Sequence, residues 1–145
     1  MNRPEAADLF LSMILARART GVIADLQAQL SEGPPGRKPA KSAVDRHEWF
    51  QNLGSDDKER TIELIGAAVD SAIFGVMVVL DGLSGGNPLE GVTSDFSLSL
   101  QTYASEQARS QNATDVAVRI NPSDTTEPLH DLLRWKLGNQ QQAPC

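Results

Sequence analysis

A helical pattern runs without interruption through residues 55–80, and any fold of this chain has to accommodate it. Apolar side chains recur along one face, and the last turns are apolar nearly all round, which indicates burial on several sides. Ser55 predicts the start of the helix, because Ser caps helix N-termini and because Asp56 and Asp57 place negative charge over the first turn, where the helix dipole favours it. Gly82 predicts the end of the helix. This segment is the expected core helix.

The residues before it predict two more helices. Residues 4–30 carry two apolar stripes that are rotated relative to each other, and Gly21 lies where the stripe changes, so we expect a bend there. Residues 31–42 are rich in Pro, Gly and basic side chains and are expected to form an exposed loop. A short helix over residues 43–53 is expected to bury its two neighbouring aromatic residues.

Beyond the core helix the pattern changes to short strands. Residues 96–100 and 116–120 alternate apolar and polar side chains, so they are expected to pair antiparallel across an intervening polar stretch. Because a lone two-stranded ribbon is marginally stable, it should pack on the helices. Thr126 is the expected cap of a last helix that Gly138 ends. Residues 139–145 are expected to be a disordered tail.

Together these elements predict an α+β fold in a single domain of residues 1–145, with a helical core of three to four helices and a small antiparallel β-hairpin packed on it. A chain of 145 residues buries about 70% of its surface on folding, enough for a sizeable core.

The longest apolar run, residues 72–80, is shorter than the ~20 residues that span a bilayer. Residues 9–16 lack the preceding positive charge of a signal peptide. With Cys145 as its single Cys, the chain is expected in the cytoplasm.

The formal charge of -6 is concentrated in one part of the chain. Residues 1–60 balance nine acidic against nine basic groups, whereas residues 61–108 have no Lys or Arg. The six carboxylates in that second segment are Glu63, Asp70, Asp81, Glu90, Asp95 and Glu106. A pI near 4.8 argues against sequence-independent binding of nucleic acid and favours a partner with a basic surface.

Five of these carboxylates and one aromatic residue are predicted to bind that partner: Glu63, Asp70, Asp81, Glu90, Asp95 and Trp135. The first three lie on one side of the core helix, but they are about 10 to 16 Å apart along it and cannot share one metal ion. A solvated acidic edge is the alternative interpretation. Asp70 is expected to bond to Ser71 or to a basic group of the N-terminal helix. Trp135 is either a packing contact or an exposed anchor for a partner.

No catalytic, metal or nucleotide motif is complete. His47-Glu48 begins like a zinc-protease motif, but Gln51 stands where the second His is required. His130-Asp131 lacks the downstream carboxylate of a metal phosphohydrolase. We therefore expect no enzymatic activity, no cofactor and no metal. The remaining enzymatic alternative is a hydrolase assembled across the fold from His47, Asp81 and His130.

Four segments within residues 60–137 carry a resemblance: Val79-Leu80-Asp81-Gly82, the strand at residues 96–100, Val118-Arg119-Ile120-Asn121-Pro122, and Leu129-His130-Asp131-Leu132-Leu133. They resemble small bacterial proteins of uncharacterised families, some of which resemble immunity partners of secreted toxins. The resemblance implies a non-enzymatic inhibitor that covers a basic toxin site with its acidic face, and it assigns no functional residue. The alternative is a domain without a toxin partner, which binds a small ligand or forms a homodimer through the hairpin edge or residues 9–14.

Overall fold

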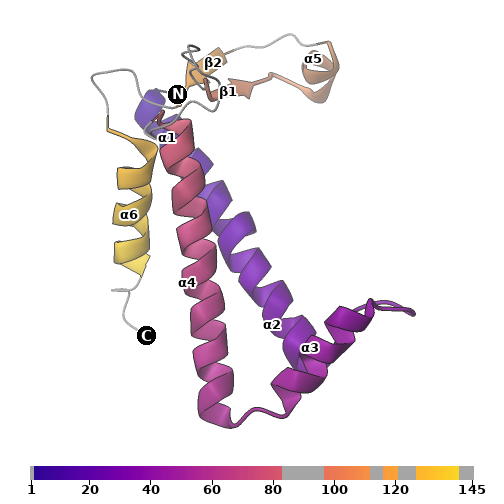
Figure 1. Ribbon diagram of the computed structural model, residues 1–145. Coiled ribbons are helices and arrows are strands. Elements are labelled where there is room, and N and C mark those ends of the chain that lie inside the picture. Colours follow the sequence, from indigo (N-terminus) through magenta and orange to yellow (C-terminus); the bar gives the residue numbers. More distant parts are fainter. Residues whose placement is uncertain (1, 83–96, 112–115, 121–126, 141–145) are drawn as a thin grey trace, which may run out of the picture. The chain divides into compact units, whose positions relative to one another are not determined.

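The computed structural model describes residues 2–82, 97–111, 116–120 and 127–140 (Figure 1). It confirms the predicted α+β class, with a helical core and one two-stranded antiparallel sheet. In chain order the elements are α1 (Arg3–Ile14), the π-helix η1 (Leu15–Gly21), α2 (Val22–Glu32), α3 (Lys41–Gln51), α4 (Ser55–Leu80), β1 (Ser99–Thr102), α5 (Glu106–Ser110), β2 (Val116–Arg119) and α6 (Leu129–Gln140). The chain divides into two compact units, residues 14–73 and residues 1–13 with 74–145.

In the unit of residues 14–73, α3 packs against the end of α2. The Gln51 side-chain amide donates to the backbone oxygens of Leu30 and Ser31, and Nδ1 of His47 lies 2.9 Å from the same Leu30 oxygen. Because a carbonyl oxygen only accepts, His47 carries its proton on Nδ1. These bonds satisfy carbonyls that a helix C-terminus leaves without partners. Gly33, at a φ of 102°, then turns the chain out of the helix.

Trp49 and Phe50 of α3 were both predicted to be buried, and the prediction is right for one of them. Phe50 is buried, whereas Trp49 is 53% exposed. His47 and Gln51, four residues apart, bond to the end of α2. Trp49 lines a cavity with Leu26 and Leu30 of α2, which leaves about half of its side chain exposed. The helix also begins and ends two residues earlier than expected, at Lys41–Gln51.

The predicted bend at Gly21 is a π-helix. Gly21 keeps right-handed helical dihedrals, φ -61° and ψ -49°, so the helical conformation continues through it. A π-helix takes more residues per turn than an α-helix, which explains why the apolar stripe before η1 is rotated relative to the stripe after it.

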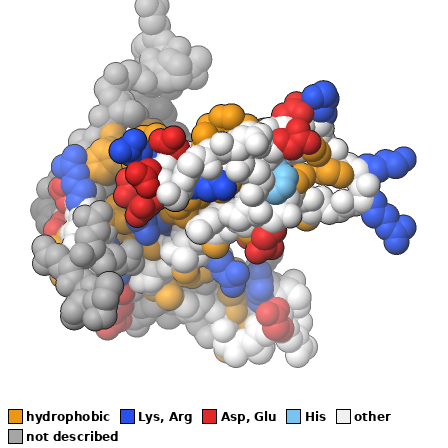
Figure 2. Space-filling model, turned by 90° about the horizontal axis from the view of Figure 1, so that it is seen from below, with side chains coloured by type: hydrophobic (Ala, Val, Ile, Leu, Met, Phe, Trp, Pro, Cys, Tyr) orange, Lys and Arg blue, Asp and Glu red, His pale blue; other side chains and the backbone are white. Residues whose placement is uncertain are grey.

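Between α2 and α3 the chain is exposed and basic. Arg37 and Lys38 are exposed, as is Lys41 at the start of α3. Figure 2 shows Lys and Arg side chains projecting at this end of the unit. Lys41 forms a surface ion pair with Asp45 at 2.8 Å, one turn further along α3.

In the unit of residues 1–13 and 74–145, the core is shared by α1, α4, α6 and the residue that follows β2. The fully buried large side chains are Leu11, Met77, Ile120, Leu129 and Leu133. Ala6 and Ala7 of α1 are 0% exposed, and small side chains at these positions let other backbone approach the helix closely.

The two strands pair antiparallel as predicted, with Leu100 opposite Val118. The amide of Ile120 donates to the Leu98 oxygen at 2.7 Å and extends the ladder beyond the strands. The polar stretch between the strands contains α5, which the sequence did not predict. Ser105 caps it by accepting from the Ala108 amide at 3.1 Å. Phe96, the first residue of the predicted strand, lies outside the described residues.

The two predicted helix stops have different outcomes. Gly82 has a φ of 72° directly after α4, so the first prediction is confirmed. Gly138 is wrong as a stop, because α6 continues through it to Gln140. A helix ends at a glycine when that glycine turns left-handed, and Gly138 does not. At the start of α4, the Ser55 hydroxyl donates to Asp56 rather than capping an amide.

α4 is long and apolar enough to cross a membrane by length and composition. Its most apolar 18 residues have a mean hydropathy of 2.0, and only 6% of that window is buried. The uninterrupted apolar run in the sequence, residues 72–80, is shorter than this window. The polar residues Asp70 and Ser71 precede the run, whereas the mean over 18 residues includes them. Length and composition alone do not assign a helix to a membrane, so the cytoplasmic location remains a prediction.

Candidate functional site

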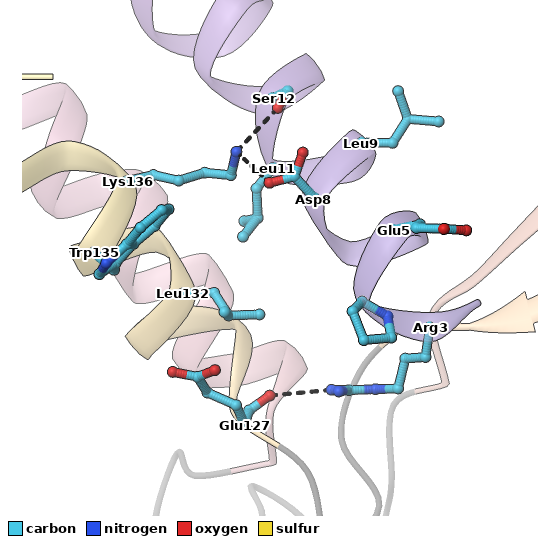
Figure 3. A pocket seen from close by; sticks show the side chains of 11 residues that line it. Arg3, Glu5, Asp8, Leu9, Leu11, Ser12, Glu127, Leu132, Trp135 and Lys136 are labelled. Atoms are coloured by element: carbon cyan, nitrogen blue, oxygen red, sulfur yellow. Dashed lines mark hydrogen bonds and ion pairs between the residues drawn. The ribbon is translucent and has the colours of Figure 1, made fainter. Parts of the chain in front are cut away.

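A groove of about 790 Å³ lies between α1 and α6 (Figure 3). Both helices contribute apolar and charged side chains to it. Its lining consists of Arg3, Pro4, Glu5, Asp8, Leu9, Leu11, Ser12, Glu127, Leu132, Trp135 and Lys136. This volume lies within the range of small-molecule binding sites in proteins, about 300 to 1,000 Å³.

Two polar links hold the sides of the groove together. Figure 3 shows Lys136 reaching from α6 to α1, where its Nζ lies 2.6 Å from Asp8 Oδ1 and 3.2 Å from Ser12 Oγ. Asp8 and Ser12 meet the same ammonium group because residues four apart share a helix face. Arg3 forms the second link by donating from Nη2 to the backbone oxygen of Glu127 at 3.1 Å. These bonds connect α1 to α6 and to Glu127 just before it.

Apolar side chains make up the rest of the lining. Leu11 is fully buried, whereas Leu9 and Trp135 are 44% and 64% exposed. Of the two interpretations offered for Trp135, the structure agrees with an exposed aromatic side chain. An exposed Trp beside an apolar groove is a common anchor in binding interfaces.

Arg3 has an unsatisfied donor. Its Nε is enclosed by protein and has no hydrogen-bond partner, and in the described part of the chain Arg3 forms no ion pair. A guanidinium offers five N–H donors, and buried donors are nearly always satisfied in folded proteins. Among the described residues of the groove, Arg3 is therefore the one with a buried side-chain donor that has no acceptor.

Asp81 is the most completely buried carboxylate described, with a side chain 0% exposed. Its oxygens accept from the Leu129 amide at 3.1 Å and the His130 amide at 2.9 Å, which are the first two residues of α6. His130 Nδ1 lies 2.8 Å from the same carboxylate and donates to it, because a carboxylate only accepts. Asp81 thus caps α6 from 48 residues away. Thr126, the predicted cap, lies outside the described residues.

The Asp81 and His130 pair is the part of the hydrolase alternative that the structure brings together. The His130 ring packs edge-on against Phe74 with centroids 5.7 Å apart, and Nε2 lies 3.5 Å from Asp131. The carboxylate already accepts from two backbone amides and the imidazole, which is the bonding of a structural cap. Among the residues described, no three His, Cys, Asp or Glu side chains are grouped to hold a metal ion.

Asp70 has the partner that was expected for it. Arg19 of η1 donates from Nε to Oδ1 at 2.5 Å and from Nη2 to Oδ2 at 3.2 Å, with both side chains about a quarter exposed. This hydrogen bond with Asp70 raises the pKa of the Arg19 guanidinium above its ordinary value. The prediction of a bond to a basic group of the N-terminal helix is confirmed.

The predicted partner-binding residues therefore differ in availability. Asp70 and Asp81 bind groups of the chain itself, Glu63 is exposed on α4, and Trp135 lines the groove. Glu90 and Asp95 lie outside the described residues. The sequence analysis missed Arg3, Asp8 and Lys136, because contacts between residues more than 100 positions apart leave no local pattern.

Compared with known protein families, curated proteins and solved structures, the chain has no match. A functional assignment therefore depends on the groove, its unsatisfied arginine and the distribution of charge.

Proposed function

We propose that this chain is a non-enzymatic binding protein and that the groove between α1 and α6 is its binding site. The observation that carries the proposal is the combination of an apolar lining with an exposed Trp135 and a half-buried Arg3. Apolar walls with a few placed polar groups are typical of small-molecule sites in proteins. The polar links across the groove preorganise it, which lowers the entropy cost of binding.

A pair of matched leucine substitutions tests the site. Leu9 lines the groove and is 44% exposed, whereas Leu64 is 70% exposed on α4 and does not line it. We expect Leu9→Ser to weaken binding of the apolar dye 1-anilinonaphthalene-8-sulfonate about fivefold or more, because it removes apolar contact area. Leu64→Ser should leave binding unchanged. Fluorescence titration measures both, and equal effects of the two substitutions would contradict the assignment.

In the second candidate function, the binding partner is a protein. The resemblance to small bacterial proteins, some of which resemble immunity partners of toxins, supports an immunity-type inhibitor of a secreted toxin domain, as do the acidic segment and the exposed Trp135. In that role, carboxylates speed encounter with a basic surface, and a central Trp supplies much of the affinity. Asp70 and Asp81 are not part of this proposed surface, because their oxygens bind Arg19 and α6.

Calorimetry with a secreted toxin domain, if the gene beside that of this chain encodes one, would test the second candidate. We expect the double substitution Glu90→Lys and Asp95→Lys to weaken binding about tenfold at low salt and to flatten its salt dependence. Glu106→Lys is the matched control, since this exposed carboxylate lies in the same segment but outside the predicted surface. Unchanged affinity in the double variant at both low and moderate salt would exclude an acidic recognition face there.

A further inference from the structure

We propose that the groove binds a small molecule with an apolar body and a single carboxylate, whose acid group pairs with Arg3. The inference depends on the proposed function, since it names the ligand class of the same groove. Leu9, Leu11, Leu132 and Trp135 supply apolar surface along the groove. Arg3 supplies a cation that no carboxylate of the described chain neutralises.

The hydrogen bonds of Arg3 indicate why the polar group of the ligand should be a carboxylate. One of its nitrogens, Nη2, already donates to the Glu127 backbone oxygen, which carries no charge. Its Nε is left with no acceptor, and a carboxylate is the acceptor whose geometry matches adjacent guanidinium donors. Arg3 lines the groove on an unbranched side chain, so a ligand carboxylate would pair with the guanidinium by a change of rotamer that exchanges the bond from Nη2 to Glu127 for an ion pair. An incoming carboxylate thus satisfies a donor that is otherwise buried without a partner.

The other charged groups limit the ligand to one acid. Lys136 is neutralised by Asp8 at 2.6 Å, so it does not offer a second free cation. Glu5 and Glu127 also line the groove, and their carboxylates repel additional negative charge. A neutral alcohol would gain no ion pair at Arg3, and an amine would meet Arg3 with like charge and pair with Glu5 or Glu127 instead. The unused donor of Arg3 therefore ranks a monocarboxylate above a neutral alcohol.

Three ten-carbon probes that differ only in the head group test this ranking. In a Trp49→Phe background, Trp135 is the only Trp of the chain, and its fluorescence reports the groove. The probes are decanoate, decan-1-ol and decylamine, each titrated at concentrations where it is monomeric. We expect decanoate to bind with 1:1 stoichiometry and about tenfold more tightly than decan-1-ol.

Arg3→Gln should lower decanoate affinity about tenfold more than it lowers decan-1-ol affinity. Arg17→Gln is the matched control, because it removes the same charge from an exposed residue outside the groove. If Arg3→Gln does not fold by circular dichroism, Arg3→Lys takes its place, and we expect a decanoate affinity between those of the parent and of decan-1-ol. Equal affinities of all three probes, or an unchanged decanoate affinity in the Arg3 variants, would overturn the acid preference while the groove remains a binding site. If no probe changes Trp135 fluorescence, both this inference and the proposed binding function fail.

Discussion

Replacing Asp81 with alanine is expected to lower the free energy of unfolding by about 3 kcal/mol. The side chain is 0% exposed and accepts from the Leu129 amide, the His130 amide and the His130 ring. Its loss would leave all three donors unsatisfied beside α4, and it would remove negative charge from the N-terminus of α6, where the helix dipole favours it. Denaturant unfolding followed by circular dichroism measures the loss.

Two variants separate the cap from a general effect of charge. Asp81→Asn keeps one oxygen acceptor in place, so it should lose about half as much stability. Asp131→Ala removes a 48% exposed carboxylate from the same first turn of α6, and its effect should be below about 0.5 kcal/mol. Amide hydrogen exchange should accelerate at Leu129 and His130 in the Asp81 variants alone. Similar losses for Asp81→Ala and Asp131→Ala would show that the buried bonds do not stabilise α6.

The ion pair between Arg19 and Asp70 is expected to behave as a partly buried unit. Arg19→Leu should cost about 2 kcal/mol, because it leaves a half-buried carboxylate without its donor, and the retained exposure of about a quarter keeps the cost below that of a fully buried pair. Asp70→Ala should cost more than Asp70→Leu, since leucine fills the vacated space. The double variant with leucine at both positions should be close to the parent protein, because no unpaired charge remains.

A double-mutant cycle on the pair measures this coupling. The surface pair of Lys41 and Asp45 is the matched control, because its side chains are 87% and 54% exposed. We expect a coupling of about 1.5 kcal/mol for Arg19 with Asp70 and about 0.3 kcal/mol for the surface pair. Couplings of the same size in both pairs would refute the role of burial, and an unstable double leucine variant would refute the expected replacement by apolar packing.

The helices and the strand pairing were largely predictable because each depends on neighbours in the chain. Gly82 ends α4 through its left-handed φ, and the alternation around Leu100 and Val118 sets which side chains share a face of the sheet. Where local signals compete, prediction was less successful. Gly138 is compatible with a helix interior at a cost of about 1 kcal/mol, so its identity alone could not place the end of α6.

The candidate site was mostly unpredictable for a different reason. The acidic segment and Trp135 could be found from composition and helical spacing, but the use of each carboxylate depends on what the fold places beside it. Asp70 and Asp81 look alike in the sequence, yet one pairs with Arg19 and the other caps α6. The groove joins residues 124 positions apart, as in the bond between Lys136 and Ser12.

By itself, the sequence determined the class of fold, the position of the long apolar helix and the segment that carries the excess negative charge. These properties follow from periodicity and composition, which are local or additive along the chain. Only the tertiary structure decided which charges remain available to a ligand, because desolvation and hydrogen bonding depend on distances across the fold. Arg3 shows the difference: in the sequence it is one of 13 basic residues, and in the structure its Nε is a buried donor without an acceptor.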